Sequence, residues 1–440
     1  MNGPFQAGAE YYVALSPGTR QLQLVFNDDG GESRSVISTS LDFIRGRVAD
    51  IGTLPLNGDF YAAGSDEIPE AQLYMEANSG YKPFTVAVVP DGYTKDELPE
   101  YVMRARSAID YLFDIEPYKT YKSFFNVWIL SAASNESGAS VTDGKGNVTI
   151  SRDTRFGSKF GENTYSDMSV DRPVLNEFLE SACPDIANGS YDLKDVPVLV
   201  LVNDERYGGI CYFGPGHGYC MVTYAYGGKR IKWPHSEIIA VSDSDPSAGT
   251  RPVTEEDYAE AGLCRGDWRN LVSHELGGHC IAHLLDEYWF DTSKEAITSM
   301  PEHSYEFPAG LNISAAWSPT PWQDDLMSRR DELIALNPLY ARIGSFQGGY
   351  LSVLNRWRSE FISCMDDNRP YFSTWQRIII ARRICAVTGA PFDLQEFFSR
   401  DVIFDPVRDA AASPRTSGPY HPYDPADEAP RPIPPVITEY

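Results

Sequence analysis

The alternation of apolar and polar residues is strongest in the first 78 residues. Short runs such as 21–26 (QLQLVF) alternate the two kinds of side chain, and turn-forming residues such as 27–31 (NDDGG) separate the runs. Alternation with a period of two, interrupted by glycine, asparagine and aspartate, is typical of antiparallel strands. We therefore expect a small N-terminal all-β domain, β-sandwich-like in form, over residues 1–78.

After residue 78 the pattern becomes that of an α/β protein. A continuous apolar run at 84–89 precedes residues 98–113, in which apolar side chains recur every three or four positions. This order predicts a buried strand that leads into an amphipathic helix. Apolar runs at 125–130 and 196–202 predict two more strands, and residues 378–387 predict a late helix. We expect these elements to form one α/β (α+β) domain over residues 79–412.

Prolines change the pattern again near the end of the chain. Eight of them lie between residues 414 and 435. Because proline lacks a backbone N–H and fixes φ, this density excludes regular helices and interior strands. Residues 413–440 are therefore expected to form a Pro-rich tail, either flexible or extended along the surface.

Composition narrows the function. Lys and Arg total 37 against 62 Asp and Glu, which gives a net charge of -25. Such an acidic surface repels a phosphate backbone, so nucleic-acid binding is disfavoured. The longest apolar runs have the length of strands, far below the roughly 18 residues that cross a bilayer, so we expect no membrane-spanning segment. The opening MNGP lacks the features of an export signal, which leaves a cytoplasmic protein and an exported one with its signal removed both open.

The cysteines leave a further question open. Seven in 440 residues are too few for a disulfide scaffold. Cys211 and Cys220 flank Pro215 and Gly216, and a turn there would place the two thiols opposite each other on a hairpin. The pair is either a disulfide or two buried thiols.

The residues with the clearest chemistry lie at 271–288 (LVSHELGGHCIAHLLDEY). Neutral imidazoles one helical turn apart commonly bind zinc, and a Glu that follows the first His then serves as general base. His274 and Glu275 begin such a site. In a regular α-helix, however, His279 at i+5 would point about 140° away from His274.

Two helix geometries resolve this conflict, and they predict different ligands. Gly277 and Gly278 could accommodate one extra residue as a π-bulge, which would return His274 and His279 to one face. We favour this interpretation, because paired glycines inside a helix are costly unless a bulge requires them. In the alternative, the helix stays regular and a stripe at i+4 intervals supplies the ligands: Glu275, His279, His283 and Glu287. A surface helix whose histidines bind no metal is the third interpretation.

These motifs resemble those of the bacterial IgA-peptidase family of zinc metallopeptidases, which are relatives of the metzincins. Members of that family show H-E-x-G-H or, in Bacteroidetes-type members, H-E-x-G-G-H, followed by L-x-D-E-Y. This chain has HELGGH at 274–279 and LLDEY at 284–288, which is similar to the Bacteroidetes type. It departs from the usual metzincin motif because Leu285 stands where a third histidine is expected.

The resemblance implies a ligand set as well as a fold. One Zn²⁺ per chain would be bound by His274, His279 and Asp286, with Glu275 as the catalytic general base. Glu287 is the second candidate for the third ligand, and His283 remains open through the regular-helix alternative. The implied fold is a metzincin-like zinc peptidase domain behind the smaller N-terminal β domain.

The likeness covers about residues 80–390. VVPDGYT at 88–94 resembles the opening strand of the family, and EPY at 116–118 with FNV at 125–127 resembles its next helix and strand. VN at 202–203 with YGG at 207–209 resembles a segment before the zinc helix. SCMDD at 363–367 resembles the methionine turn, in which Met365 would form a hydrophobic floor under the zinc ligands. Plain core packing is the alternative role for Met365.

The function that the resemblance implies is a zinc-dependent endopeptidase acting on peptide or protein substrates, with host proteins such as immunoglobulin A as candidates. It also implies a secreted, cell-surface or periplasmic location. The alternative from another class is a noncatalytic surface binding protein with a structural or degenerate metal site. Glu275 favours the enzyme, because a binding protein has no use for a general base beside the first ligand.

Overall fold

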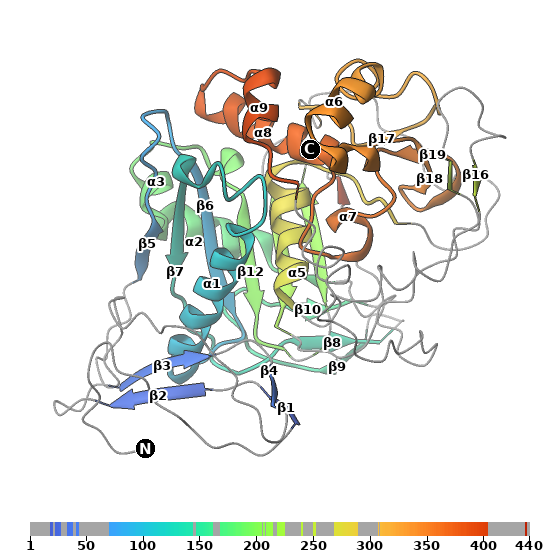
Figure 1. Ribbon diagram of the computed structural model, residues 1–440. Coiled ribbons are helices and arrows are strands. Elements are labelled where there is room, and N and C mark those ends of the chain that lie inside the picture. The colour runs from blue at the N-terminus through green and yellow to red at the C-terminus, as the bar shows by residue number, and fades with distance from the viewer. Residues whose placement is uncertain are drawn as a thin grey trace. The chain divides into compact units, whose positions relative to one another are not determined.

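The computed structural model describes residues 70–143, 147–161, 168–204, 206, 208–213, 218–224, 268–288, 307 and 309–403, and the backbone of several short strands elsewhere (Figure 1). The chain divides into two compact units, Met1–Ile68 and Pro69–Tyr440. Most of the Pro-rich tail at 413–440 lies outside the described residues.

The N-terminal unit is described by four short strands. They form two antiparallel pairs, β1 (Gly18–Arg20) with β4 (Leu41–Phe43) and β2 (Gln23–Asn27) with β3 (Ser33–Ile37). The strand predicted at 21–26 is present as β2. The β-sandwich-like form of the N-terminal domain stays a prediction.

The larger unit is built on a seven-stranded sheet in the order β20-β13-β14-β12-β6-β7-β5. Neighbours among β14, β12, β6 and β7 are parallel, whereas β13 and β5 are antiparallel to β14 and β7. The bounds are β5 (Ala71–Met75), β6 (Phe84–Asp91), β7 (Phe125–Leu130), β12 (Val198–Val202), β13 (Gly209–Phe213), β14 (Tyr219–Thr223) and β20 (Val436–Ile437).

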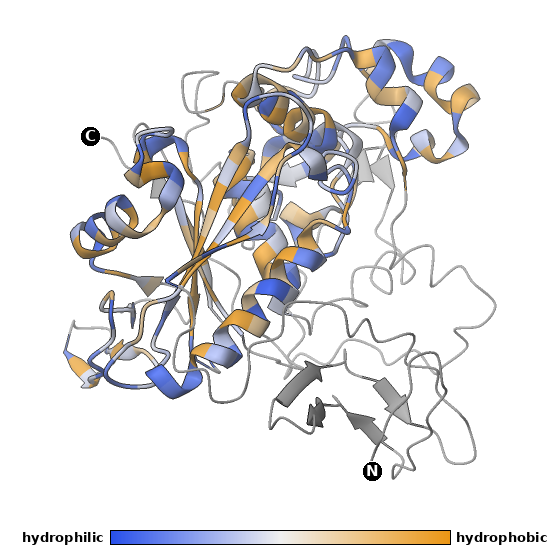
Figure 2. Cartoon of the chain, turned by 90° about the vertical axis from the view of Figure 1, so that its left-hand side faces the viewer, coloured by the Kyte–Doolittle hydropathy of each residue, from blue (hydrophilic) through white to orange (hydrophobic). Residues whose placement is uncertain are grey.

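Strands β6 and β12 are buried at every position, because helices cover both faces of this sheet. Successive side chains of a strand point to opposite faces. On one face Val89 and Val200 share a core cluster with Leu175 of α2 (Arg172–Ala182). On the other, Tyr101 of α1 (Leu98–Leu112) donates a hydrogen bond to the carbonyl of Val88 at 2.9 Å. Figure 2 shows the apolar colour of these central strands.

The remaining elements surround the sheet. A four-stranded sheet has the order β11-β10-β8-β9, and a three-stranded sheet has the order β17-β19-β18. Their bounds are β8 (Ser140–Thr142), β9 (Val148–Ile150), β10 (Lys159–Phe160), β11 (Met168–Ser169), β17 (Ile313–Ser314), β18 (Phe346–Gly349) and β19 (Ser352–Arg358). The strands β15 (Ile239–Ala240) and β16 (Thr250–Arg251) pair with each other.

The other helices are short, except for α8. They are α3 (Pro184–Ala187), α5 (Trp268–Val272), α6 (Arg330–Leu336), α7 (Cys364–Asp367), α8 (Thr374–Thr388) and α9 (Leu394–Arg400). Single 3-10 turns are η1 (Lys95–Glu97), η2 (Lys122–Phe124), η3 (Leu193–Asp195), η5 (Met327–Arg329) and η6 (Pro338–Arg342).

The mixed α/β class expected from the pattern is confirmed, and the strands and helices predicted at 84–89, 98–113, 125–130, 196–202 and 378–387 are present as β6, α1, β7, β12 and part of α8. Residues 71–75, which the sequence assigned to the N-terminal domain, form β5 in the large sheet. The compact N-terminal unit ends at Ile68, not at residue 78. No helix among the described residues is long and apolar enough to cross a membrane.

Candidate metal centre

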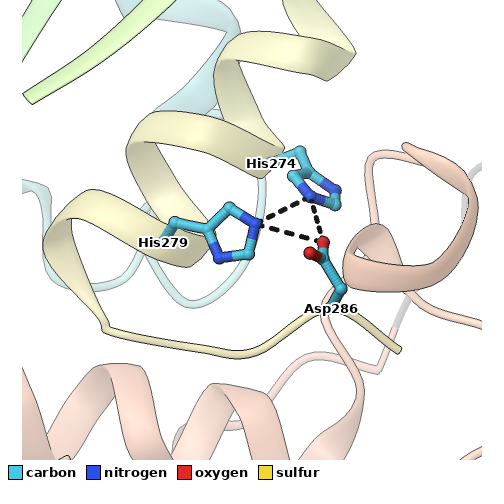
Figure 3. A group of neighbouring side chains, drawn as sticks. All are labelled: His274, His279 and Asp286. Carbon is cyan, nitrogen blue, oxygen red and sulfur yellow. Dashed lines mark hydrogen bonds and ion pairs between the residues drawn. The ribbon is translucent and has the colours of Figure 1, made fainter. Parts of the chain in front are cut away.

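The two candidate histidine ligands lie on a helix that changes its winding. Helix α5 continues into a π-helix, η4 (Ser273–Ile281). Because a π-helix closes hydrogen bonds between residues five apart, such residues lie on the same side. His274 and His279 accordingly point toward each other in Figure 3. The chain adopts the π geometry that Gly277 and Gly278 favoured. The alternative prediction, a regular α-helix over these residues, is wrong.

Gly277 and Gly278 allow the π-helix to lie directly against its neighbours. A Cβ on Gly277 would lie 2.8 Å from Leu112 Cδ1 of α1. One on Gly278 would overlap the sulfur of Met365 and lie 2.8 Å from its Cε. Met365 is fully buried and fills the space that a side chain on Gly278 would need. It therefore packs directly against the helix that carries the histidines.

His274, His279 and Asp286 form a compact buried group (Figure 3). The two Nε2 atoms are 3.0 Å apart, and Asp286 Oδ1 lies 2.9 Å from His274 Nε2 and 3.1 Å from His279 Nε2. All three side chains are 0% exposed. Two imidazole nitrogens and one carboxylate oxygen that converge in this way match the donor set of zinc.

Backbone carbonyls behind the imidazoles set their tautomers. His274 Nδ1 is 2.9 Å from the carbonyl of Cys364, and His279 Nδ1 is 2.6 Å from the carbonyl of Leu284. A carbonyl only accepts, so each Nδ1 carries the proton and donates it. Each Nε2 is thereby left with its lone pair facing Asp286, as a metal ligand requires.

The electrostatics of the group favour the protonation state of ligands. Burial lowers the pKa of His274 below its usual value, which keeps the ring neutral. Burial opposes ionisation of Asp286, but the charge of a protonated imidazole beside it would outweigh burial and hold the pKa of that carboxyl below its usual value. A cation bound to the neutral imidazoles would act in the same direction. Asp286 Oδ2 is buried without a hydrogen-bond partner among the described residues. A cation would compensate both the buried negative charge of Asp286 and its unpaired oxygen.

Glu275 follows the first histidine and is 0% exposed. Neither of its carboxylate oxygens has a hydrogen-bond partner among the described residues. Burial, followed by the negative charge of Asp286, raises its pKa well above the usual value. An unpaired buried carboxyl group is unfavourable for folding, and Glu275 places one beside the group formed by His274, His279 and Asp286.

The two other ligand candidates lie outside this group. Glu287 accepts hydrogen bonds from Asn312 Nδ2 at 3.1 Å and Ser363 Oγ at 2.7 Å, and burial raises its pKa to about 7. His283 follows the π-helix with a φ of 57°, and its ring stacks on Phe213 at 4.9 Å between centroids. Only Asp286 joins the two histidines.

Several supporting residues escaped the sequence analysis. Leu284, Ser363 and Cys364 lie in the LLDEY and SCMDD motifs, but the sequence does not show that their carbonyls or hydroxyl would contact the histidines or Glu287. Asn312 lies in neither motif. Tyr288, the last residue of the LLDEY motif, is 1% exposed, and its ring stacks on that of His274 at 6.3 Å between centroids.

Cys211 and Cys220 are directly opposite each other on the β13–β14 hairpin, as the turn residues predicted. They do not form a disulfide. Burial, followed by the neighbouring Cys280 thiol, raises the pKa of both well above the usual value, so they remain protonated. Of the two alternatives, the chain has the pair of buried thiols.

A mixed α/β fold in which two imidazoles and a carboxylate converge, those of His274, His279 and Asp286, is that of a candidate metalloenzyme. Residues 76–225 match the model of the family described as IgA Peptidase M64. This match confirms the resemblance to the IgA-peptidase family and supports a metallopeptidase, a hydrolase of peptide bonds. No curated protein matches the chain. The matched residues contain most of the large sheet and end before the helix that carries His274 and His279.

Proposed function

We propose that the protein is a zinc-dependent endopeptidase. The observation that carries the proposal is the convergence of His274, His279 and Asp286, with Glu275 beside the first ligand, in a chain that matches a metallopeptidase family. In this proposal the three residues would hold one Zn²⁺. The bound metal would supply a Lewis acid that polarises the scissile carbonyl and activates a water molecule.

Glu275 would perform the proton transfers. A cation bound beside it would counter the effect of burial and keep Glu275 ionised. Its carboxylate would accept a proton from the attacking water and later donate it to the leaving amine, so that the peptide bond is replaced by a carboxylic acid and an amine. The neutral imidazoles would stay in place throughout, because their Nδ1–H groups are held by the Cys364 and Leu284 carbonyls.

Metal analysis of the purified protein, together with cleavage of a peptide library, tests this proposal. We expect one zinc per chain and cleavage that stops when a chelator is added. His274→Ala should lose both zinc and cleavage, whereas His283→Ala, outside the metal-binding group, should keep its zinc. Cleavage that survives complete metal removal would rule out the zinc mechanism.

Substrate and location are further parts of the proposal. The family supports peptide or protein substrates, and its name makes immunoglobulin A the first host protein to incubate with the enzyme. Export to the cell surface, the periplasm or the medium rests on the family resemblance. Immunodetection in fractions of the producing cells would test it. A zinc-loaded protein that cleaves no peptide would instead support the noncatalytic binding protein.

A further inference from the structure

The third candidate ligand does not lie on the helix that carries the other two. The π-helix ends at Ile281, and Asp286 belongs to the non-helical residues 284–288. An irregular segment has no internal ladder of hydrogen bonds to fix its path. The position of Asp286 relative to the histidines therefore depends on what holds this segment from outside.

Asn312 contacts the segment from a distant part of the chain. It directly precedes β17, which pairs with β19, and it is 0% exposed. Its Oδ1 accepts the N–H of Leu285 at 2.8 Å, and its Nδ2 donates to the carbonyl of Leu285 at 2.8 Å. The same Nδ2 donates to Glu287 Oε1 at 3.1 Å. One carboxamide thus takes the place of a backbone partner at Leu285, whereas the carbonyls of Asp286 and Tyr288 accept from the backbone N–H groups of Tyr350 and Leu351 at 2.9 and 3.1 Å.

These three hydrogen bonds bracket Asp286. Leu285 precedes it and Glu287 follows it, so fixing both neighbours leaves the aspartate little freedom to rotate away from the histidines. The N–H of Glu287 also donates to the carbonyl of Met365 at 2.8 Å. Its second carboxylate oxygen accepts from Ser363, which adjoins the Cys364 carbonyl that holds His274. The ligand segment and the support of His274 are therefore tied together.

We propose that Asn312 is a positioning residue that sets Asp286 against His274 and His279 in the geometry for metal binding. The inference rests on the proposed metal function of these residues and assigns no contact between Asn312 and the metal. Asparagine suits the role because its side chain presents a donor and an acceptor together, as a peptide group does. Partners of metal ligands typically change metal affinity or activity by about 10- to 100-fold when they are mutated.

Asn312→Asp in the full chain tests the proposal with little change of shape. The new carboxylate keeps an acceptor for Leu285 N–H but places an oxygen against the Leu285 carbonyl and Glu287, which are both acceptors. We expect zinc to bind about 10- to 100-fold more weakly, measured by competition with a chromogenic chelator. The visible absorption of the cobalt-loaded protein should change as well, because it reports ligand geometry.

Asn203→Asp is the matched control. Asn203 is also buried and also donates two hydrogen bonds from its amide, to Gly92 O at 2.9 Å and Ser137 Oγ at 3.1 Å, but it contacts no residue of 284–288. If the loss of buried hydrogen bonds were sufficient, both variants would weaken zinc binding. We expect the control to bind zinc like the wild type.

The outcomes separate this inference from the proposed function. Wild-type zinc affinity in a folded Asn312→Asp variant would overturn the inference and leave the zinc site intact. A wild-type protein that binds no zinc would overturn the proposed function, and the inference with it. If Asn312→Asp does not fold, Asn312→Ser gives the same test, because its shorter hydroxyl cannot reach both groups of Leu285. The Asn312→Ser variant should then also bind zinc more weakly than the wild type.

Discussion

At the scale of single residues, the hydrogen-bond partners of His274 and His279 determine which ring nitrogen faces Asp286. The Nδ1–H groups of His274 and His279 are bound to backbone carbonyls, so only the Nε2 atoms face Asp286. Glu275, in contrast, has no hydrogen-bond partner on either carboxylate oxygen among the described residues. His274 and Glu275 are adjacent in sequence, yet the first is held by a hydrogen bond and the carboxylate of the second is not.

Glu275→Gln is expected to separate catalysis from metal binding. The amide has nearly the same shape, but it cannot accept the proton of the attacking water. We expect kcat/KM to fall by about 10²- to 10⁴-fold, the usual contribution of a general acid–base group. Zinc content should stay at the wild-type value, because Glu275 is not among the three candidate ligands.

Peptide cleavage and elemental analysis on the same preparation measure both quantities. Glu97→Gln is a suitable control, because Glu97 accepts its hydrogen bonds from Thr94 and Ser137, remote from the metal-binding group. Undiminished cleavage by Glu275→Gln would show that another group moves the proton.

At the scale of elements, the π-helix is the feature on which the centre depends. A spacing of five would separate two histidines on a regular helix by about 140°. The wider winding of Ser273–Ile281 brings them together, and the two glycines let Leu112 and Met365 pack against the backbone. The spacing of five between His274 and His279 therefore suits a π-helix, in which residues five apart lie on the same side.

Gly278→Ala is expected to destabilise the protein, although alanine is the better helix former by about 1 kcal/mol. Its Cβ would overlap the Met365 sulfur, and overpacking of a buried site typically costs about 1–3 kcal/mol. The midpoint of urea unfolding should therefore fall. In a Met365→Ala background the same substitution should cost less, since the clashing side chain is gone. Equal costs in both backgrounds would contradict this packing.

The β13–β14 hairpin gives a second prediction at this scale. Cys211 and Cys220 are opposite each other and not bonded. Denaturation without reductant, followed by alkylation and mass spectrometry, should therefore find both cysteines alkylated. Recovery of a crosslinked peptide that contains the two residues would contradict the free pair.

At the scale of the whole molecule, the division into two units has a consequence for truncation. The compact unit that begins at Pro69 contains the whole candidate centre, and its strand β5 pairs with β7. We expect a chain that starts at Pro69 to fold, to bind zinc and to cleave short peptides as the full chain does. Zinc content and kcat/KM on a short peptide would measure this.

A chain that starts at Asn78 is the informative comparison, because it lacks β5. The edge of β7 would lose its partner, and an unpaired edge strand promotes aggregation. We expect this shorter chain to be less stable and less soluble. If both truncated chains lost zinc binding alike, the centre would depend on the N-terminal unit.

Much of the large sheet could be predicted from the sequence, because a short continuous apolar run bounded by polar residues is typical of a buried strand. The runs at 84–89 and 196–202 become fully buried strands, and the three-to-four spacing of 98–113 becomes α1. Only tertiary structure showed that 71–75 belongs with them, since an edge strand is defined by the partner it meets.

The candidate centre divides in the same way. The residue types and spacings at 274–288 by themselves indicated zinc chemistry and limited the ligands to a few residues, since imidazoles and carboxylates are what zinc binds. That Asp286 lies with the two histidines, whereas Glu287 and His283 do not, was decided by the fold, because it depends on where the chain goes after the helix ends. Asn312 and the adjacent residues Ser363 and Cys364 belong to later segments of the chain, and only folding brings them to Glu287 and His274.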